Sequence, residues 1–289
     1  MPDWENLRHF LAVAWAGSLS GAARSLKVDH ATVSRRLTAL EAELDVRLVD
    51  RLPKSCRLTP TGQAVYERGL AMEDAVNGIE RIAKAAQKPE VAQVTLSAPP
   101  VLVTHVLAGN LARFQADFPD IRLSLVAQAQ QVSLSKREAD IAVRLVRPQE
   151  PSNVARRIGH MDFGLYARRG YAEVTPPENR RFITYDRGVG DIPQQRWILA
   201  IAGGRPVSCE LSDISGHSIA ARAGAGVAGL PRFLGDGDPD LARVEEEYEP
   251  FSRDIWLVVH EDLRHAPALR AVMDFVASLI AESPGLALR

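Results

Sequence analysis

The sequence predicts an α/β protein with an all-α-rich head, and three patterns along the chain support this fold class. Apolar residues in roughly the first sixty positions recur at helical spacing between turn residues. In the next segment, residues 60–87, apolar and small residues recur about every 3.5 residues. Residues 91–289 alternate between strand-like and helix-like patterns, which is typical of a parallel sheet covered by helices. A chain of 289 residues is long enough for about two domains.

The head is predicted to begin with three helices. Asp3 can cap the first, Ser18 opens the second, and Asp29 can cap the third. A single apolar stripe lies along the third helix and consists of Val33, Leu37, Leu40 and Leu44. Two short helices joined by a tight turn, with alanines where they approach closely, are typical of a helix-turn-helix.

The outward face of the third helix carries the candidate DNA contacts. Small polar side chains near its N-terminus can reach base edges in the major groove, and arginines can bind bases or phosphates. Residues 46–59 form two short alternating runs around a polar turn and predict a β-hairpin wing. The candidate DNA-binding residues are His30, Ala31, Thr32, Ser34, Arg35, Arg36 and Thr38 on the helix, and Arg51 and Lys54 on the wing. A small helical domain with solvated arginines is the alternative interpretation.

Charge is distributed unevenly along the chain. The net charge is −1, yet residues 24–57 hold eight Lys or Arg and five acidic residues, a local charge of +3. The rest of the chain therefore carries −4. A basic patch on an otherwise acidic chain indicates one module that binds a polyanion and argues against general affinity for nucleic acid.

A long helix is predicted from Thr59-Pro60 to about Gln87. Its apolar and small residues recur at alternating spacings of four and three, which is typical of a coiled-coil seam. The candidate dimerisation residues are Val65, Met72, Val76 and Ile79. A helix packed inside a globular core is the alternative. A seam would bring two heads together for two DNA half-sites.

Composition narrows the cellular context. Hydrophobic residues make up 46% and charged residues 25% of the chain, as in soluble globular proteins. No apolar run has the roughly 18 residues of a membrane span, and the N-terminus lacks the features of a signal peptide. Only two cysteines occur, far apart. We therefore expect a cytoplasmic protein with neither disulfides nor a membrane partner.

Several motifs of the head and linker occur in the order and spacing of one known family. They are Phe10-Leu-Ala-Val-Ala, Gly17-Ser18-Leu19, Ala22-Ala23-Arg24-Ser25-Leu26, Val33-Ser34-Arg35-Arg36-Leu37, Leu40-Glu41-Ala42-Glu43-Leu44, Val46-Arg47-Leu48-Val49-Asp50-Arg51 and Leu58-Thr59-Pro60-Thr61-Gly62. In these residues the chain resembles the LysR-type transcriptional regulators. A weaker similarity continues through residues 91–289.

The resemblance implies a domain plan and a set of partners. Residues 1–59 would form a winged helix-turn-helix, residues 60–88 a linker helix for dimerisation, and residues 91–289 a two-lobed effector domain similar to periplasmic binding proteins. Lobe I would comprise 91–160 and 265–289, and lobe II 161–264. Double-stranded DNA, a small-molecule effector and the chain itself, as homodimer and homotetramer, would be partners. RNA polymerase is a further candidate partner, and no cofactor is implied.

One departure from the family concerns the start of the recognition helix. Family members often have Ser-Gln-Pro-Ala where this chain has Asp29-His30-Ala31-Thr32. Asp29 can still cap the helix. His30, however, changes the hydrogen-bonding groups at a position that reads bases, so the operator sequence stays open.

Residues 91–289, which follow the linker, are predicted to form two sets of alternating strands and helices. Strands are expected at 91–97, 121–127, 140–144, 162–166, 227–229 and 255–260, and helices at 101–118, 132–138, 213–223 and 266–281. In such sheets ligands bind beyond the carboxyl ends of the strands, here between the lobes. The candidate effector-binding residues are Pro99, Pro100, Val101, Gln128, Arg144, Ser212 and Asp213.

These residues favour a small organic anion as effector. Helix N-termini attract anions, and Arg144 can clamp a carboxylate. Two features weigh against an anion: the family often has Ser or Thr at Val101, and Asp213 would repel a negative charge. An Arg144–Asp213 ion pair across the cleft is an equal alternative.

Other motifs and function classes are weaker. Gly224-x-Gly226-x-x-Gly229 matches a dinucleotide-binding fingerprint, but a helical pattern precedes it and a strand follows, so Gly224 is interpreted as a helix C-cap. His260-Glu261 and His265 are one residue too long for a zinc motif. No nucleophile–base set or metal cluster indicates an enzyme.

Two further alternatives stay open. A redox-sensing regulator could act through Cys209 or Cys56. A solute-binding or sensor protein without promoter control would explain residues 91–289 but not the basic head. The molybdate-dependent regulators have smaller all-β ligand domains, which the alternating pattern disfavours.

Overall fold

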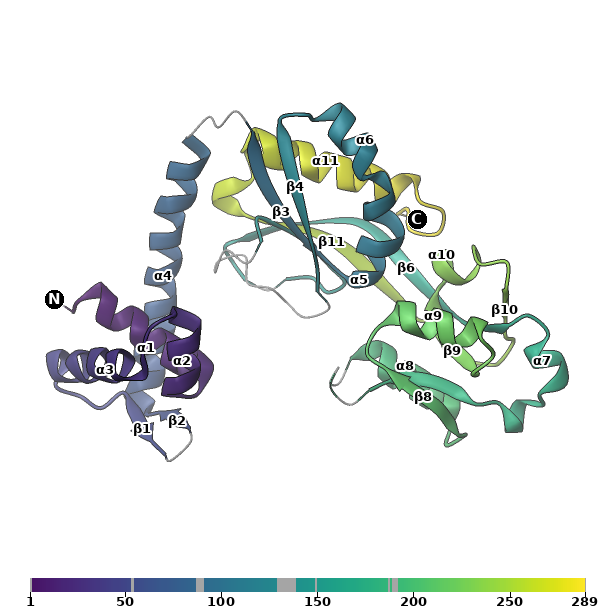
Figure 1. Cartoon of the computed structure of the whole chain (residues 1–289), viewed down its shortest axis with the longest axis horizontal. Coiled ribbons are helices and arrows are strands. Elements are labelled where there is room, and N and C mark those ends of the chain that lie inside the picture. The colour runs from purple at the N-terminus through teal and green to yellow at the C-terminus, as the bar shows by residue number, and fades with distance from the viewer. Residues whose placement is uncertain are drawn as a thin grey trace. The chain divides into compact units, whose positions relative to one another are not determined.

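The computed structural model describes residues 2–52, 55–86, 91–128, 139–148, 150–186, 188 and 192–288. The chain forms two compact units, residues 1–84 and 85–289 (Figure 1). Two predictions lie outside the described residues: the helix at 132–138 and the wing residue Lys54. In the described segments, no helix is both long enough and apolar enough to cross a lipid bilayer.

The first unit begins with the three expected helices, α1 (Trp4–Ala16), α2 (Leu19–Leu26) and α3 (His30–Leu44). Each has the N-cap that the sequence predicts. The Asp3 carboxylate accepts a hydrogen bond from the Glu5 N–H, the Ser18 hydroxyl from Gly21, and the Asp29 carboxylate from Thr32. Side-chain caps of this kind satisfy backbone donors that the helix itself leaves unpaired.

The stripe along α3 forms the centre of the head's core. Val33, Leu37 and Leu40 are fully buried, and Phe10 of α1 packs in the same cluster. Strands β1 (Val49–Arg51) and β2 (Cys56–Leu58) follow as an antiparallel hairpin. The unit is therefore a helix-turn-helix with a wing.

Helix α4 (Pro60–Ala86) completes the first unit. Thr59 accepts a hydrogen bond from the Gly62 N–H at 2.9 Å and so caps it. Gly62 lies against the carbonyl of Leu48, where a side chain would collide with the backbone. At Gly69 an added Cβ would lie 2.8 Å from Leu11 Cδ2 of α1. Two glycines thus allow α4 to lie directly on the head.

The second unit is built on one extended sheet with strand order β4-β3-β5-β11-β6-β9-β7-β8, and β10 pairs with β6. The strands are β3 (Ala92–Ala98), β4 (Ile121–Ala127), β5 (Ile141–Arg144), β6 (Asn153–Arg168), β7 (Phe182–Tyr185), β8 (Val207–Leu211), β9 (Val227–Pro231), β10 (Leu241–Arg243) and β11 (Ser252–His260). Strands β3, β4 and β5 are parallel, and so are β7, β8 and β9. Each parallel group forms the sheet of one lobe.

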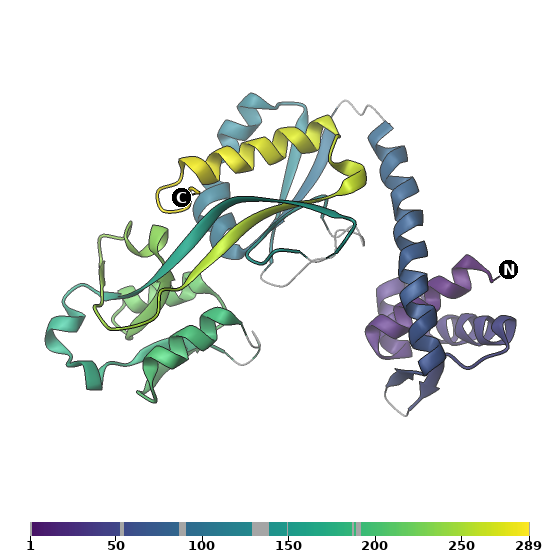
Figure 2. The same cartoon turned by 180° about the vertical axis from the view of Figure 1, so that it is seen from behind.

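Strands β6 and β11 connect the two groups (Figure 2). The first part of β6 pairs antiparallel with β11, and residues from Phe163 onward pair with β9 and β10. The expected strand at 162–166 is therefore only the end of a 16-residue strand. Its beginning was missed because Arg156-Arg157 and Gly159 interrupt the alternation of apolar residues.

Helices cover both groups of strands. The region 101–118 is helical as expected, but as consecutive short pieces: α5 (Pro100–Leu102), a π-turn (Val103–Leu107), a 3₁₀ turn (Ala108–Asn110) and α6 (Leu111–Asp117). The other α-helices in the described part of the unit are α7 (Tyr171–Val174), α8 (Pro193–Ala202), α9 (Ile214–Arg222), α10 (Arg232–Gly235) and α11 (Pro267–Glu282). Val272, Val276 and Ile280 of α11 are buried in the main core of the unit.

Candidate functional site

The outward face of α3 presents the first candidate site. His30, Ala31 and Arg35 are exposed on it. Within the described residues, neither His30 nor Arg35 has a hydrogen-bond or ion-pair partner in its own chain. Asp29 and Thr32 are engaged with one another at the helix start, where the Thr32 N–H and hydroxyl hold the pKa of Asp29 below its usual value. The free groups near the N-terminus of the helix are therefore His30 and Arg35.

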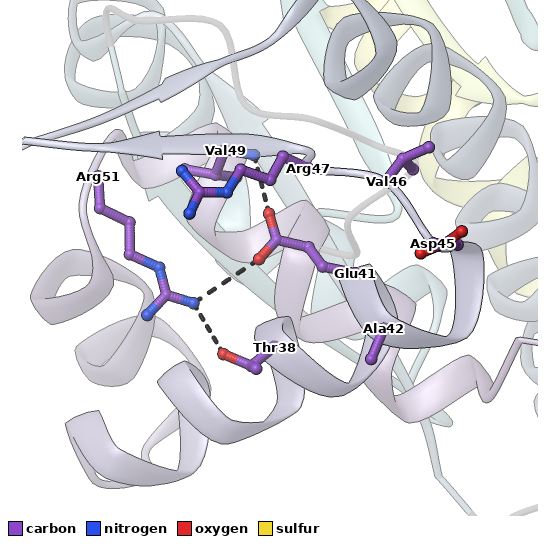
Figure 3. Close-up of a pocket in the computed structure, with 8 residues that line it drawn as sticks. All are labelled: Thr38, Glu41, Ala42, Asp45, Val46, Arg47, Val49 and Arg51. Atoms are coloured by element: carbon purple, nitrogen blue, oxygen red, sulfur yellow. Dashed lines mark hydrogen bonds and ion pairs between the residues drawn. The ribbon is translucent and has the colours of Figure 1, made fainter.

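Arg51 of the wing lies across the same face (Figure 3). Its Nη2 donates to Thr38 Oγ1 at 2.8 Å and lies 3.7 Å from Glu41 Oε2, and its Nη1 donates to Ser34 Oγ at 3.3 Å. Glu41 in turn accepts hydrogen bonds from the N–H groups of Leu48 and Val49 at 2.8 and 3.1 Å. Three of the predicted DNA contacts, Ser34, Thr38 and Arg51, thus form one hydrogen-bonded cluster.

Arg36 has a different environment from the other predicted DNA contacts. Its guanidinium donates to Asn6 Oδ1 at 3.2 Å and lies 3.4 Å from Asp3 Oδ2. Its side chain is half-buried and ties α3 to the start of α1. Since Leu37 must face the core, the neighbouring side chain at position 36 falls on the α1 side of α3. In this structure the Arg36 guanidinium is therefore engaged with its own head, through Asp3 and Asn6.

The predicted dimerisation residues divide into two groups. Val65 packs against the core of its own head. Met72 and Ile79 are 52% and 69% exposed, large values for such apolar side chains, and Val76 is half-buried. Apolar residues exposed along one stripe of a long helix are typical of an unfilled helix–helix contact.

The second unit contains a cavity of about 620 Å³ that all seven predicted effector residues line. Pro99 follows β3, Pro100 and Val101 begin α5, Gln128 follows β4, and Arg144 ends β5. Ser212 and Asp213 precede α9 in the other lobe. The volume is in the range of small-molecule sites.

The two predicted charged residues of this cavity do not form an ion pair with one another. Arg144 Nη1 donates to the Val143 carbonyl at 2.9 Å and to Ser97 Oγ at 3.3 Å. Asp213 Oδ1 accepts hydrogen bonds from the N–H groups of Ser215 and Gly216 at 2.8 and 3.1 Å, as the N-cap of α9. The alternative of a cross-cleft Arg144–Asp213 pair is therefore not what the structure contains.

The cavity has four further polar residues that the sequence did not reveal: Tyr185, Asp186, Gln194 and Arg253. Arg253 lies in β11, where the expected strand began only at residue 255. Tyr185 ends β7 and Gln194 is near the start of α8, and neither of these elements was predicted. Their short apolar patterns carry no period long enough to distinguish strand from helix.

The glycine-rich motif has the structural role that the sequence suggested. Gly224 follows α9 with a φ of +89°, which favours glycine, and β9 begins at Val227. At Gly229 an added Cβ would lie 2.6 Å from the Trp197 ring. The order of elements is helix, turn, strand, the reverse of a dinucleotide site.

The two cysteines lie in different compact units. Cys56 belongs to β2, Cys209 to β8, and both are free and half-buried. Each unit therefore contains a single thiol and has no resolving cysteine of its own.

A winged helix-turn-helix joined to a two-lobed α/β unit with a ligand-sized cavity defines a class of protein: DNA-binding regulators that respond to small molecules. Comparison with known proteins identifies the family. Residues 4–63 match the bacterial regulatory helix-turn-helix protein, lysR family, and residues 87–281 match the LysR substrate binding domain. The chain belongs to the LysR family and is a DNA-binding transcriptional regulator with an effector-binding domain.

Individual relatives are similar in sequence to this chain over nearly its whole length. The Mau operon transcriptional activator of Paracoccus denitrificans is 28% identical over 281 residues, 97% of this chain and 98% of its own. The HTH-type transcriptional regulator CrgA of Neisseria meningitidis serogroup C is 29% identical, over 94% of this chain and 95% of its own. These relatives are regulators of transcription.

Solved structures show the same fold. The structure of CrgA from Neisseria meningitidis has a TM-score of 0.55 at 26% identity and covers 95% of this chain and 97% of its own. Full-length CbnR complexed with its target DNA has a TM-score of 0.54 at 20% identity, covering 96% and 99%.

Proposed function

We propose that this regulator reads its operator through the N-terminal half of α3 and that a small organic anion in the cavity of the second unit controls it. The observation that carries the first part is the outward position of Arg35 and His30, with Arg51 fixed beside them. An arginine without an internal partner can donate two hydrogen bonds to a guanine or bind a phosphate.

The proposed assembly follows from α4. Exposed Met72 and Ile79 on one stripe would pair with the same helix of a second chain, with Val76 between them. Two heads would then meet two half-sites of a symmetric operator, and two such dimers would form a tetramer. The proposed division is a DNA-binding head over 1–59, a linker helix over 60–88 and an effector domain over 91–289, in a protein of the cytoplasm.

Selection of binding sites from random duplex DNA tests the DNA part. The full chain should enrich a site with two symmetric halves, and its affinity should fall steeply as salt rises. R35A should weaken binding to the selected site by about tenfold or more. R113A, which removes an exposed arginine from the second unit, serves as the charge-matched control. A wild-type chain that binds no duplex even at low ionic strength would contradict the proposal.

Titration of the same selection with pooled small organic acids tests the effector part. An active acid should change the amount of DNA bound or the spacing of the half-sites. R144A should weaken the response to that acid if Arg144 holds its carboxylate. Unchanged affinity of R144A for the acid would remove this arginine from the site.

A further inference from the structure

The guanidinium of Arg253 lies in the wall of the cavity and is held by neutral groups. Its Nε and Nη2 donate to the carbonyl oxygen of Leu145 at 3.1 and 2.9 Å, and its Nη1 donates to Gln194 Oε1 at 2.8 Å. Leu145 follows β5 in one lobe, whereas Gln194 begins α8 in the other. Arg253 therefore occupies the junction of the two lobes, on one of the two strands that connect them.

No carboxylate of the described residues forms an ion pair with Arg253. Burial lowers the pKa of this guanidinium, because a charged group loses hydration inside the protein. Partly buried arginines are normally paired with an acid, since unpaired burial of a charge is costly. An arginine kept at this position without an acidic partner can bind an anion.

The acidic residues of the cavity are already occupied. Asp213 caps α9 with one oxygen, and Asp186 Oδ1 accepts a hydrogen bond of 2.6 Å from the Gly188 N–H. Arg144, the other cation of the wall, donates to Ser97 and Val143. Arg253 donates to the Leu145 carbonyl and to the side-chain amide oxygen of Gln194, one partner from each lobe.

Most of the remaining wall is apolar. It includes Val143, Val146, Met161, Phe163, Ile192 and Ile214. Tyr185 lines the same wall; burial raises the pKa of its hydroxyl, Asp213 adds to this rise and Arg253 opposes it. Such a lining favours a ligand with an uncharged hydrocarbon body, because burying apolar surface drives binding while a second charge would lose its hydration.

We propose that Arg253 is the anion-binding residue of the effector cavity and that its ligand is a small monocarboxylate with an uncharged, mainly hydrocarbon body. The proposal rests on the cavity being the effector site and adds its ligand class and its principal residue. A carboxylate bound bidentately to the guanidinium would compete with Leu145 and Gln194 for the same N–H donors. Ligand binding would thereby alter a connection between the two lobes.

Two sets of three probes, each on one carbon skeleton, test the ligand class. The first set is 4-methylpentanoate, 4-methylpentanamide and leucine, and the second is 3-phenylpropanoate, 3-phenylpropanamide and phenylalanine. Isothermal titration of the full chain should detect at least one of the two acids. Its amide, which lacks the charge, and the amino acid, which adds an ammonium group, should each bind at least tenfold more weakly.

Variants then test the residue. R253Q should weaken binding of the active acid at least tenfold, because it removes a charge-assisted hydrogen-bonding pair. R253K keeps the charge but not the fork of donors, and should show an intermediate loss. R113A should bind the acid like the wild type. Thermal unfolding of R253Q and R253K checks that both variants are folded. If R253Q does not fold, the affinity of R253K decides the test.

The outcomes separate this proposal from the proposed function. Equal binding of acid and amide, tighter binding of the amino acid, or no binding of either acid would overturn the ligand class. Unchanged affinity in R253Q and R253K would overturn the role of Arg253. V146W narrows the cavity at an exposed wall residue. If it leaves the affinity of an active acid unchanged, that acid binds elsewhere, and the cavity itself loses its proposed function.

Discussion

Arg51 Nη2 donates a hydrogen bond of 2.8 Å to Thr38 Oγ1 and so joins the wing to the middle of the recognition helix (Figure 3). The same guanidinium binds Ser34 and lies beside Glu41, which holds the backbone at the start of β1. The wing and α3 are therefore linked through this one cluster. A change in this cluster should affect DNA binding through both elements.

R51A should reduce affinity for the selected operator by about tenfold, because the cluster loses its centre and the surface loses one charge. R51K separates the two causes. It keeps the charge but cannot hold Ser34 and Thr38 together, so we expect a nearly unchanged salt dependence with reduced discrimination between operator and random duplex. Fluorescence anisotropy at several salt concentrations measures both quantities. If R51K matches the wild type in discrimination, Arg51 acts by its charge alone.

M72E should lower self-association, because a buried carboxylate is disfavoured in a helix–helix seam. Sedimentation velocity should show smaller species, and the dissociation constant for self-association should rise at least tenfold. A71E is the matched control, since Ala71 is the exposed neighbouring residue outside the apolar stripe and gains the same charge. Equal effects of the two substitutions would contradict a seam at Met72.

G62A should destabilise the head by about 2 kcal/mol or more, because the added methyl group would meet the Leu48 carbonyl and displace α4. G109A, at a helical glycine with open space around its Cβ position, should be neutral or slightly stabilising. Calorimetric unfolding of the full chain measures both. If G62A leaves the stability unchanged, α4 can move away from β1 without a cost in the free energy of unfolding.

The second unit should lose stability as the pH falls below about 6.5. His217 is buried in α9, its Nε2 donates to the Leu211 carbonyl at 3.1 Å, and burial lowers its pKa. Burial lowers the pKa of His105 as well. In the unfolded chain a histidine gains its proton near pH 6.5, whereas in the folded chain the lowered pKa shifts proton uptake to lower pH.

This difference in pKa between the folded and unfolded chain determines that stability decreases as the pH falls. The stabilisation is present above the unfolded pKa and is lost as the pH falls, by up to about 1.4 kcal/mol per pH unit for the buried His217. Unfolding by calorimetry at pH 7.5, 6.5 and 5.5 should show the decline. H217Q should flatten it, and H265Q, at an exposed histidine, is the control. A slope that H217Q leaves unchanged would assign the pH dependence to other groups.

Much of the head could be predicted because its signals are local. The caps Asp3, Ser18 and Asp29 and the stripe from Val33 to Leu40 act within one or two helical turns, so the sequence shows them directly. Arg36 could not be placed in this way. Its partners Asp3 and Asn6 lie about thirty residues earlier, and only tertiary packing brings them close.

For the cavity, too, the sequence reveals residues with local signals and misses those that only tertiary packing brings close. Arg144 was found because it ends a recognisable strand and strand ends converge in a parallel sheet, and Ser212 because it lies at the start of a predicted helix. Arg253 and Gln194 lie on a crossing strand and on an unpredicted helix, where no local pattern marks them. Glu246 is similar: it binds Arg180 at 2.9 Å and Arg205 at 2.7 Å, yet the sequence shows only an acidic run.

The late position of β11 in the chain has a consequence for biosynthesis. Strand β5 pairs with β3 on one side and with β11 on the other, and β11 lies more than a hundred residues downstream. Until the ribosome has delivered that strand, β5 is an open edge that can pair with foreign strands. The head is translated first and is complete by α4. A nascent chain can thus carry a finished DNA-binding module while its sensor is still exposed to aggregation and proteases.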